Sequence, residues 1–345
     1  MKKVLVVVLA LVLVATAFVG CAPAPAASQS AEAPSESASA EATDAVECAS
    51  AAAGKDPSEM TFGYLVQTET TEFMLHIVQG IQDRCDELGI KLIVNDADGD
   101  PSKQISQCES LISQGVDAVI VTPVDAQASV PVVEKCNAAG IPVVGVCTTL
   151  EGDIQPDAFV GSDDTQSADL AVTALADAIG GKGKIGMLRG IAGQSSEVIR
   201  GDAAKKLLEE KYPDIELVVE DIGNWSRDEA MTIMENWIQK YGEELVGVFA
   251  QNDEMAIGAC NAIENAGLTG KIQVTGIDLV ADAKEYLADG RLAADVFQDG
   301  YGQGFKSVDV ALALVNGEQV EKETWIPFEL VTKENMEEYF SIKQQ

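Results

Sequence analysis

The chain has 345 residues, of which 47% are hydrophobic, so it is long enough for two domains and too apolar for a disordered protein. Its formal net charge of −33 excludes nucleic acid as a partner, because phosphate-binding proteins present lysine and arginine. The seven cysteines include no CxxC pair, which argues against a zinc site or a disulfide framework. We expect no metal and no cofactor.

The N-terminus is typical of an export signal over residues 1–20. Two lysines precede an apolar run at residues 4–19, which has signal-peptide length and is short for a membrane span. The run ends in Phe18-Val19-Gly20-Cys21, which resembles a bacterial lipobox, where the cysteine becomes the lipidated first residue of the mature protein. An ordinary cleaved signal with an incidental cysteine is the alternative.

Residues 21–58 are rich in Ala, Pro, Ser and Glu and contain no aromatic residue. Such a composition cannot bury a core, so we expect a disordered acidic tether. With a lipid on Cys21, the tether would hold the folded body at the outer face of the cytoplasmic membrane.

From residue 61 onward, short apolar runs alternate with amphipathic segments. Strands are predicted at residues 61–66, 91–95, 118–121, 143–146, 158–160, 184–188, 216–220, 246–250, 273–276 and 293–297. Helices are predicted at residues 72–88, 102–114, 127–139, 165–179, 196–211, 227–241, 254–266, 281–288 and 302–316. This alternation predicts an α/β fold with parallel sheets, right-handed crossovers and helices on both faces.

Residues 116–146 and 245–278 share one plan: an apolar strand, a polar turn with an aspartate, a helix, a stop and another strand. A plan that recurs about 130 residues later predicts two lobes of similar build.

Ligands of parallel sheets bind beyond the carboxyl ends of the strands. The segments that follow the predicted strands carry amides, hydroxyls, carboxylates and a few aromatic residues, without Lys or Arg, which suits a neutral polyhydroxylated solute. Phe73 and Trp225 each follow a strand end and could sandwich a ring-shaped solute between two lobes, with core packing as the alternative.

Three patterns that suggest other chemistry fail in context. Residues 181–186 fit GxGxxG but precede a strand, so they predict a turn. Residues 96–100 look like a calcium loop, yet Pro101 and Gln107 stand where that loop needs glycine and glutamate. The single histidine, His76, has no nucleophile pattern around it, so we expect no catalytic residue.

Four segments then identify a family by resemblance. They are IPVVGV at 141–146, GIAGQSS at 190–196, VFAQNDEMAIG at 248–258 and VTGID at 274–278. They resemble segments of the bacterial ribose-type periplasmic binding proteins, the sugar-capturing components of ABC importers, and the likeness runs over about residues 61–333.

The resemblance implies a type I fold in which a hinge closes two lobes on the ligand. It places the chain crossings at Ser162/Asp163, Gln298/Asp299 and Glu329/Leu330. The N-terminal lobe would comprise residues 59–162 and 299–329, and the C-terminal lobe residues 163–298 and 330–345.

Carried over by position, the resemblance implies stacking by two aromatic rings and hydroxyl binding by three polar side chains: Phe73, Trp225, Asn252, Asp278 and Gln298. At six further ligand positions the chain departs from the family: Thr71, Met74, Thr122, Cys147, Thr148 and Val198. The last three replace an Asp-Arg pair and a second Arg, although Arg200 is nearby. Because an Arg–Asp pair fixes sugar hydroxyls, its loss argues against ribose itself.

Within VFAQNDEMAIG, Asp253 is expected to be the N-cap of a helix that starts at Glu254, and Asn252 to face the ligand. Gln251 is given no role.

The leading hypothesis is a lipid-anchored, monomeric solute receptor that binds a small neutral sugar, polyol or modified sugar and passes it to an ABC permease in the membrane. A sensory receptor component, for a furanose-type signal or for chemotaxis, is a second hypothesis, and an exported enzyme is a third. A DNA-binding repressor of this fold is disfavoured because residues 1–21 stand where its DNA-binding head would be.

Overall fold

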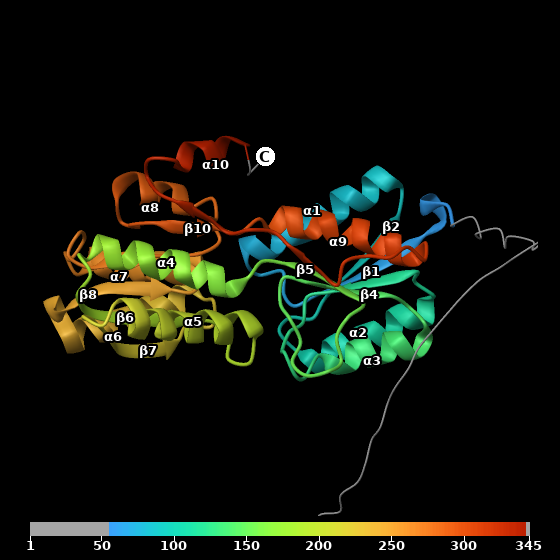
Figure 1. The fold of residues 1–345 in the computed structure, drawn as a ribbon, viewed down its shortest axis with the longest axis horizontal. Helices are drawn as coiled ribbons and strands as arrows, with labels where there is room; N and C mark the ends of the chain where they lie inside the picture. Colours follow the sequence, from blue (N-terminus) through green and yellow to red (C-terminus); the bar gives the residue numbers. More distant parts are fainter. Residues whose placement is uncertain (1–54, 343–345) are drawn as a thin grey trace, which may run out of the picture. The chain divides into compact units, whose positions relative to one another are not determined.

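The computed structural model describes residues 55–342, which belong to one compact unit (Figure 1). The predicted signal peptide, Cys21 and most of the predicted tether lie outside these residues. The folded body begins earlier than residue 59, the first residue after the predicted tether. A short 3-10 helix, η1 (Pro57–Glu59), is capped by Asp56, and Lys55 Nζ lies 2.7 Å from Asp117 Oδ1.

The first lobe is built on a six-stranded parallel sheet with the order β11-β5-β4-β3-β1-β2. Its strands are β1 (Thr61–Val66), β2 (Lys91–Asp96), β3 (Ala118–Val121), β4 (Val143–Val146), β5 (Ala158–Gly161) and β11 (Glu323–Trp325). Helices α1 (Glu72–Leu88) and α9 (Gly300–Val315) cover one face, and α2 (Pro101–Gln114) and α3 (Val130–Ala139) cover the other (Figure 1).

The core of this lobe follows from the period of two in its strands. Phe62, Tyr64 and Val66 of β1 pack toward α1 and α9, whereas Leu65 between them packs toward α2 and α3. Both faces of the sheet are buried, which explains why these strands read as continuous apolar runs.

The second lobe repeats this build. Its parallel sheet has the order β7-β6-β8-β9, from β6 (Gly183–Arg189), β7 (Ile215–Ile222), β8 (Leu245–Ala250) and β9 (Gln273–Thr275). An antiparallel pair, β10 (Asp295–Phe297) and β12 (Glu329–Val331), is linked to the sheet by the bridge between Thr275 and Ala294. Its helices are α4 (Asp164–Ala178), α5 (Ser195–Lys211), α6 (Arg227–Tyr241), α7 (Asp253–Asn265), α8 (Ala283–Asp289) and α10 (Met336–Ile342), with the 3-10 turn η2 (Gly242–Glu244).

The predicted α/β class with two similar parallel sheets is confirmed. In both sheets the second strand lies at one edge, outside the first, and the third follows on the other side. The strand order therefore reverses between β1 and β3 and between β6 and β8, where the ligand crevices of such sheets form.

The chain passes between the lobes at residues 162–163, 298–299 and 326–328. The third crossing lies before the predicted Glu329/Leu330, because Leu330 already pairs with Val296 in the second lobe. Ile326 N donates to Gly161 O (2.8 Å) on the first-lobe side, and Phe328 is buried in the second-lobe core.

Most predicted elements differ from the structure by one or two residues at their ends. The helix expected at 127–139 starts later, because the Asp125 carboxylate accepts from Gln127 N and Ala128 N and forms a turn there.

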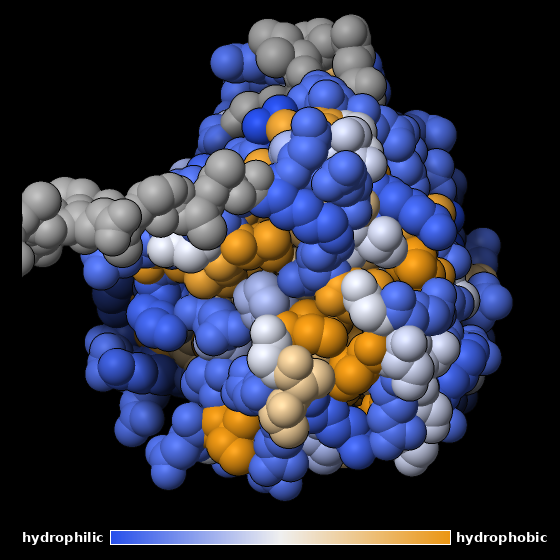
Figure 2. Space-filling view, turned by 90° about the vertical axis from the view of Figure 1, so that its right-hand side faces the viewer, coloured by the Kyte–Doolittle hydropathy of each residue, from blue (hydrophilic) through white to orange (hydrophobic). Residues whose placement is uncertain are grey.

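The face at the first-lobe end of the molecule is mostly hydrophilic, with hydrophobic residues in separate groups between polar ones (Figure 2). Such scattered apolar side chains are ordinary on a soluble surface and need no partner. Among residues 55–342, no helix is both long and apolar enough for a membrane span.

Helices α1 and α9 touch backbone to backbone through glycine. A Cβ on Gly80 would collide with Tyr301 O and lie 2.9 Å from Phe305 N. We expect Gly80→Ala to lower the free energy of unfolding by about 1–3 kcal/mol, because the helices must move apart. Urea unfolding measures this, with Gln79→Ala on the exposed side of α1 as the control. Equal effects of the two changes would contradict the expectation.

Candidate ligand-binding site

A cavity of about 270 Å³ lies between the two lobes, at the carboxyl ends of their strands. It is lined by Gln67, Thr68, Thr70, Thr71, Phe73, Met74, Asp98, Gly99, Cys147, Thr148, Ile191, Gln194, Ser196, Arg200, Trp225, Asn252, Asp278 and Gln298. The first lobe contributes the segments after β1, β2 and β4, and the second lobe those after β6 to β10.

The structure brings most predicted site residues together in this cavity. Phe73, Trp225, Asn252, Asp278 and Gln298 all line it. Thr71, Met74, Cys147 and Thr148 line it as well, and their departures from the family pattern are therefore changes in the cavity wall.

Two predicted residues do not line the cavity. Thr122 is fully buried beside it, with Oγ1 2.8 Å from the Tyr64 hydroxyl. Val198 is 42% exposed on α5. Residues that are two positions apart in an α-helix point about 200° apart around its axis, so a helix that turns Arg200 into the cavity turns Val198 to solvent. Thr122 is therefore separated from the cavity by its burial beside Tyr64, and Val198 by the turn of α5.

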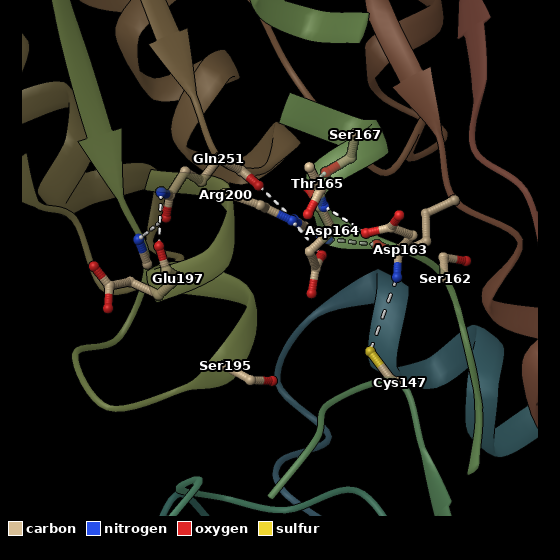
Figure 3. A network of polar contacts seen from close by, with 12 residues as sticks. Cys147, Ser162, Asp163, Asp164, Thr165, Ser167, Ser195, Glu197, Arg200 and Gln251 are labelled. Atoms are coloured by element: carbon tan, nitrogen blue, oxygen red, sulfur yellow. Dashed lines mark hydrogen bonds and ion pairs between the residues drawn. The ribbon is translucent and has the colours of Figure 1, made fainter. Parts of the chain in front are cut away.

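Arg200 is the main residue that sequence reasoning missed, and the expectation of a wall without lysine or arginine was wrong. It is only 3% exposed, and its guanidinium donates to Asp164 Oδ1 (2.7 Å), Gln251 O (2.6 Å) and Gln298 Oε1 (2.9 Å). Figure 3 shows Arg200 between Gln251 and Asp164. The available signal was its place in the segment after GIAGQSS.

Arg200 also joins the cavity to the chain crossings. Asp164 follows the first crossing, Gln298 belongs to the second, and the Phe328 ring of the third lies 5.8 Å from the guanidinium carbon. Burial alone would lower the pKa of Arg200, but Asp164 and Asp278 outweigh burial and raise it. The guanidinium is therefore charged, with the Asp164 carboxylate as its hydrogen-bonded partner.

Asp278 has an uncommon backbone that points to a functional position. Its φ is 126° and that of Leu279 is 60°, both in the region that L residues rarely adopt. The strained turn is stabilised by Asp253, whose Oδ2 accepts a hydrogen bond from Val280 N (2.8 Å). No hydrogen bond to the Asp278 carboxylate is seen within residues 55–340, so its oxygens are available to a ligand.

Asn252, and not Asp253, caps α7. Asn252 Oδ1 accepts from Met255 N (3.1 Å), which leaves its Nδ2 group to donate into the cavity. Asp253 is the first helical residue and fully buried, so the predicted N-cap was wrong. Gln251 accepts from Gly190 N (2.9 Å) and donates to Glu197 O (3.0 Å), and so ties together the loops after β6 and β8.

Trp225 lies against a glycine that makes room for its ring. A Cβ on Gly190 would overlap the indole, so only glycine permits this close approach. Trp225 Nε1 donates to Gln194 Oε1 (2.7 Å), which fixes the orientation of the ring. Phe73 faces the cavity from the first lobe and is otherwise buried.

The two lobes are in contact around the cavity. Gln194 Nε2 donates to Gln67 Oε1 (3.1 Å) and to Val124 O (3.2 Å), and Thr149 N donates to Ser195 Oγ (2.9 Å). Elsewhere, Ala281 N donates to a first-lobe carboxylate, that of Glu72 (2.7 Å). These contacts hold the lobes together around the cavity, which stays partly open to solvent.

Behind Asp278 lies a buried pair of acids, Asp253 and Asp295. Within residues 55–340, no hydrogen-bond partner is seen for Asp253 Oδ1 or for Asp295 Oδ2, and both residues are completely buried. Burial, followed by the charge of Asp295, raises the pKa of Asp253 well above its usual range, and burial raises that of Asp295 to about 6. We infer that one proton is held between the two carboxyl groups.

This pair gives the protein a pH-dependent stability. A carboxyl whose pKa is raised by folding contributes stability that is fully present below its unfolded pKa of about 4 and is lost as pH rises to its folded pKa, which is about 6 for Asp295. Asp253→Asn supplies an N–H in place of the shared proton at every pH. Between pH 5 and pH 8, we expect the free energy of unfolding of this variant to fall by about 1–2 kcal/mol less than that of the wild type.

Urea unfolding at several pH values measures this difference. Asp202→Asn, an exposed change of the same charge on α5, is the control. Parallel pH profiles for wild type and Asp253→Asn would rule out the shared proton.

Two parallel-sheet lobes around a polar and aromatic cavity, with three chain crossings beside it, define a solute-binding protein. Residues 62–319 match the family described as a periplasmic binding protein domain, and the chain belongs to this family. Its location is therefore extracytoplasmic.

Three relatives illustrate the similarity. The chain is 37% identical over 274 residues to a xylitol-binding protein of Mycolicibacterium smegmatis, covering 78% of this chain and 76% of that protein. It is 38% identical over 285 residues to a putative rhizopine-binding protein of Rhizobium meliloti, covering 81% and 92%. The structure of an ABC transporter solute-binding protein from Bacillus halodurans with bound myo-inositol is 36% identical, with a TM-score of 0.79 over 84% of this chain and 99% of that chain.

Proposed function

We propose that this protein captures one small neutral sugar, polyol or modified sugar in the interlobe cavity and delivers it to an ABC permease. The proposal rests on the residues that line the cavity. Asp278, Asn252 and Arg200 line it together with the rings of Phe73 and Trp225. Ring faces pack on C–H surfaces, and the polar groups bind hydroxyls.

The size of the cavity and the relatives support this substrate class. About 270 Å³ is at the small end of ligand pockets and suits a single ring or a short polyol. Relatives that are more than 30% identical are named for xylitol, rhizopine and ribose, or were solved with myo-inositol or D-allose.

We also propose that the protein works as a monomer without catalytic activity and is anchored by a lipid on Cys21. The lipobox-like segment supports the anchor, and the absence of a nucleophile–base pattern in the sequence supports a purely binding role. Partition of the expressed protein into a detergent phase tests the anchor. Cys21→Ser should move the protein to the aqueous phase, and equal partition of both forms would contradict lipidation.

A thermal-shift screen against pentoses, hexoses, pentitols and inositols tests the substrate class. A true ligand at about 100 times its Kd adds about 2.7 kcal/mol to the stability, which raises the melting temperature by several degrees. We expect a rise with a narrow group of these solutes. A rise with amino acids or organic anions instead would contradict the proposal.

A further inference from the structure

The two halves of the cavity differ in the polar groups that they leave free. In the second lobe, the Asp278 carboxylate has no protein hydrogen-bond partner within residues 55–340, and Asn252 keeps its Nδ2 group after capping α7. Gln298 Nε2 has only a distant contact, 3.9 Å from Cys147 Sγ. This half can therefore form several hydrogen bonds with neighbouring hydroxyls.

The first-lobe half is different, because each of its buried polar side chains already makes at least one hydrogen bond within the protein. Thr148 donates to Pro123 O (3.2 Å), and Thr71 caps α1 by accepting from Met74 N (3.5 Å). Gln67 accepts from Gln194 and donates to Met74 Sδ (3.3 Å). The remaining polar residues of this half, Thr68, Thr70 and Asp98, are partly or fully exposed.

The other buried side chains that line the first-lobe half are those of two sulfur-containing residues and one aromatic residue, which are weak hydrogen-bond partners or none. Met74 is 3% exposed and Cys147 is 6% exposed, and both line the cavity with Phe73. Burial raises the pKa of Cys147 above its ordinary range, so the thiol stays neutral. Figure 3 shows Cys147 below Arg200 and Asp164, with its sulfur pointing toward them.

Thioethers and thiols are weak hydrogen-bond partners and pack well against methyl groups. A ligand hydroxyl placed against Met74 and Cys147 would lose its water without a good replacement. A methyl or methylene group at the same place has no hydrogen bonds to water to lose, and its burial removes apolar surface from water.

We propose that the ligand is two-faced: a polyhydroxylated ring or chain with one apolar edge, such as a 6-deoxy sugar or an O-methylated polyol. Its adjacent hydroxyls bind Asp278, Asn252 and Gln298, and its methyl or deoxy edge packs on Met74 and Cys147. This inference rests on the proposed function and narrows its substrate class.

Calorimetric titration of matched pairs tests the inference. The pairs are D-galactose with its 6-deoxy form D-fucose, D-ribose with 5-deoxy-D-ribose, and myo-inositol with a mono-O-methyl inositol. In at least one pair, we expect the deoxy or methylated member to bind about tenfold tighter or more, as one added or removed group in an apolar pocket commonly does. Tighter binding of the hydroxylated parent in every pair that binds would overturn the inference but leave the proposed function standing. No binding by any member would contradict both.

Two variants of Met74 locate the effect in the cavity wall. Met74→Gln places an amide of similar length there and should reduce the preference for the deoxy or methylated member about tenfold. Met74→Leu keeps the wall apolar and should retain the preference. Unchanged preference in Met74→Gln, with both variants folded by circular dichroism, would overturn the assignment of the apolar edge to this wall.

Discussion

Replacement of Arg200 by methionine is expected to lower the free energy of unfolding by about 3–5 kcal/mol, because it leaves Asp164 buried without its charged partner. The two side chains are 4% and 7% exposed, and the Arg200 Nε to Asp164 Oδ1 distance is 2.7 Å. Methionine keeps much of the length and volume of the arginine, so the loss reports mainly the missing charge and hydrogen bonds. Urea unfolding at constant pH measures the effect.

A double-mutant cycle separates this pair from other effects of the change. Asp164→Asn with Arg200→Met removes both charges, and we expect it to be more stable than Arg200→Met alone, because no uncompensated buried charge remains. Additive losses in the double variant would show that the pair does not act as a unit. A fall of less than about 1 kcal/mol in the free energy of unfolding of Arg200→Met would also contradict this role of the ion pair.

Replacement of Asp278 by alanine is expected to weaken ligand binding about 100-fold or more. The Asp278 carboxyl would form hydrogen bonds with ligand hydroxyls in a largely buried site, where leaving such a hydroxyl without a partner costs about 1–3 kcal/mol. The melting temperature should change little in comparison, because no protein hydrogen bond to this carboxylate is seen within residues 55–340. Calorimetry gives the affinity, and circular dichroism gives the melting temperature.

Asn252 needs a different substitution, because it also caps α7. Asn252→Ala would remove the cap and lower stability by about 1 kcal/mol, which would confuse the result. Asn252→Ser keeps a capping oxygen and removes the Nδ2 donor, so it should weaken binding at nearly wild-type stability. Wild-type affinity in both Asp278→Ala and Asn252→Ser would place the ligand elsewhere.

The sequence predicted the fold well because the signals are local. Apolar runs such as residues 118–121 and 143–146 end in polar residues at the sheet edge, and the topology of parallel sheets then brings these ends together. Phe73, Trp225, Asn252 and Asp278 could be placed at the cavity for this reason. The same strand, turn and helix plan occurs at residues 116–146 and 245–278, and this repeat predicted the second lobe.

What the sequence could not predict depends on contacts between distant segments. Arg200 lies in the interior of a helix, and only the packing of α5 against the chain crossings shows that it faces the cavity. Asn252 and Asp253 are both good N-caps, and the extended backbone of Asn252 decides between them. Asp295 pairs with Asp253 across two elements, so no local pattern indicated their shared proton.

Calorimetric titration of the purified protein with the solutes that raise its melting temperature tests whether the interlobe cavity binds a sugar or polyol. We expect one binding site per chain for a small neutral polyhydroxylated compound, with the affinity lost in Asp278→Ala. This assignment would be contradicted by a compound that binds equally well to the wild type and to Asp278→Ala, or by a chain that binds none of the sugars, polyols and cyclitols.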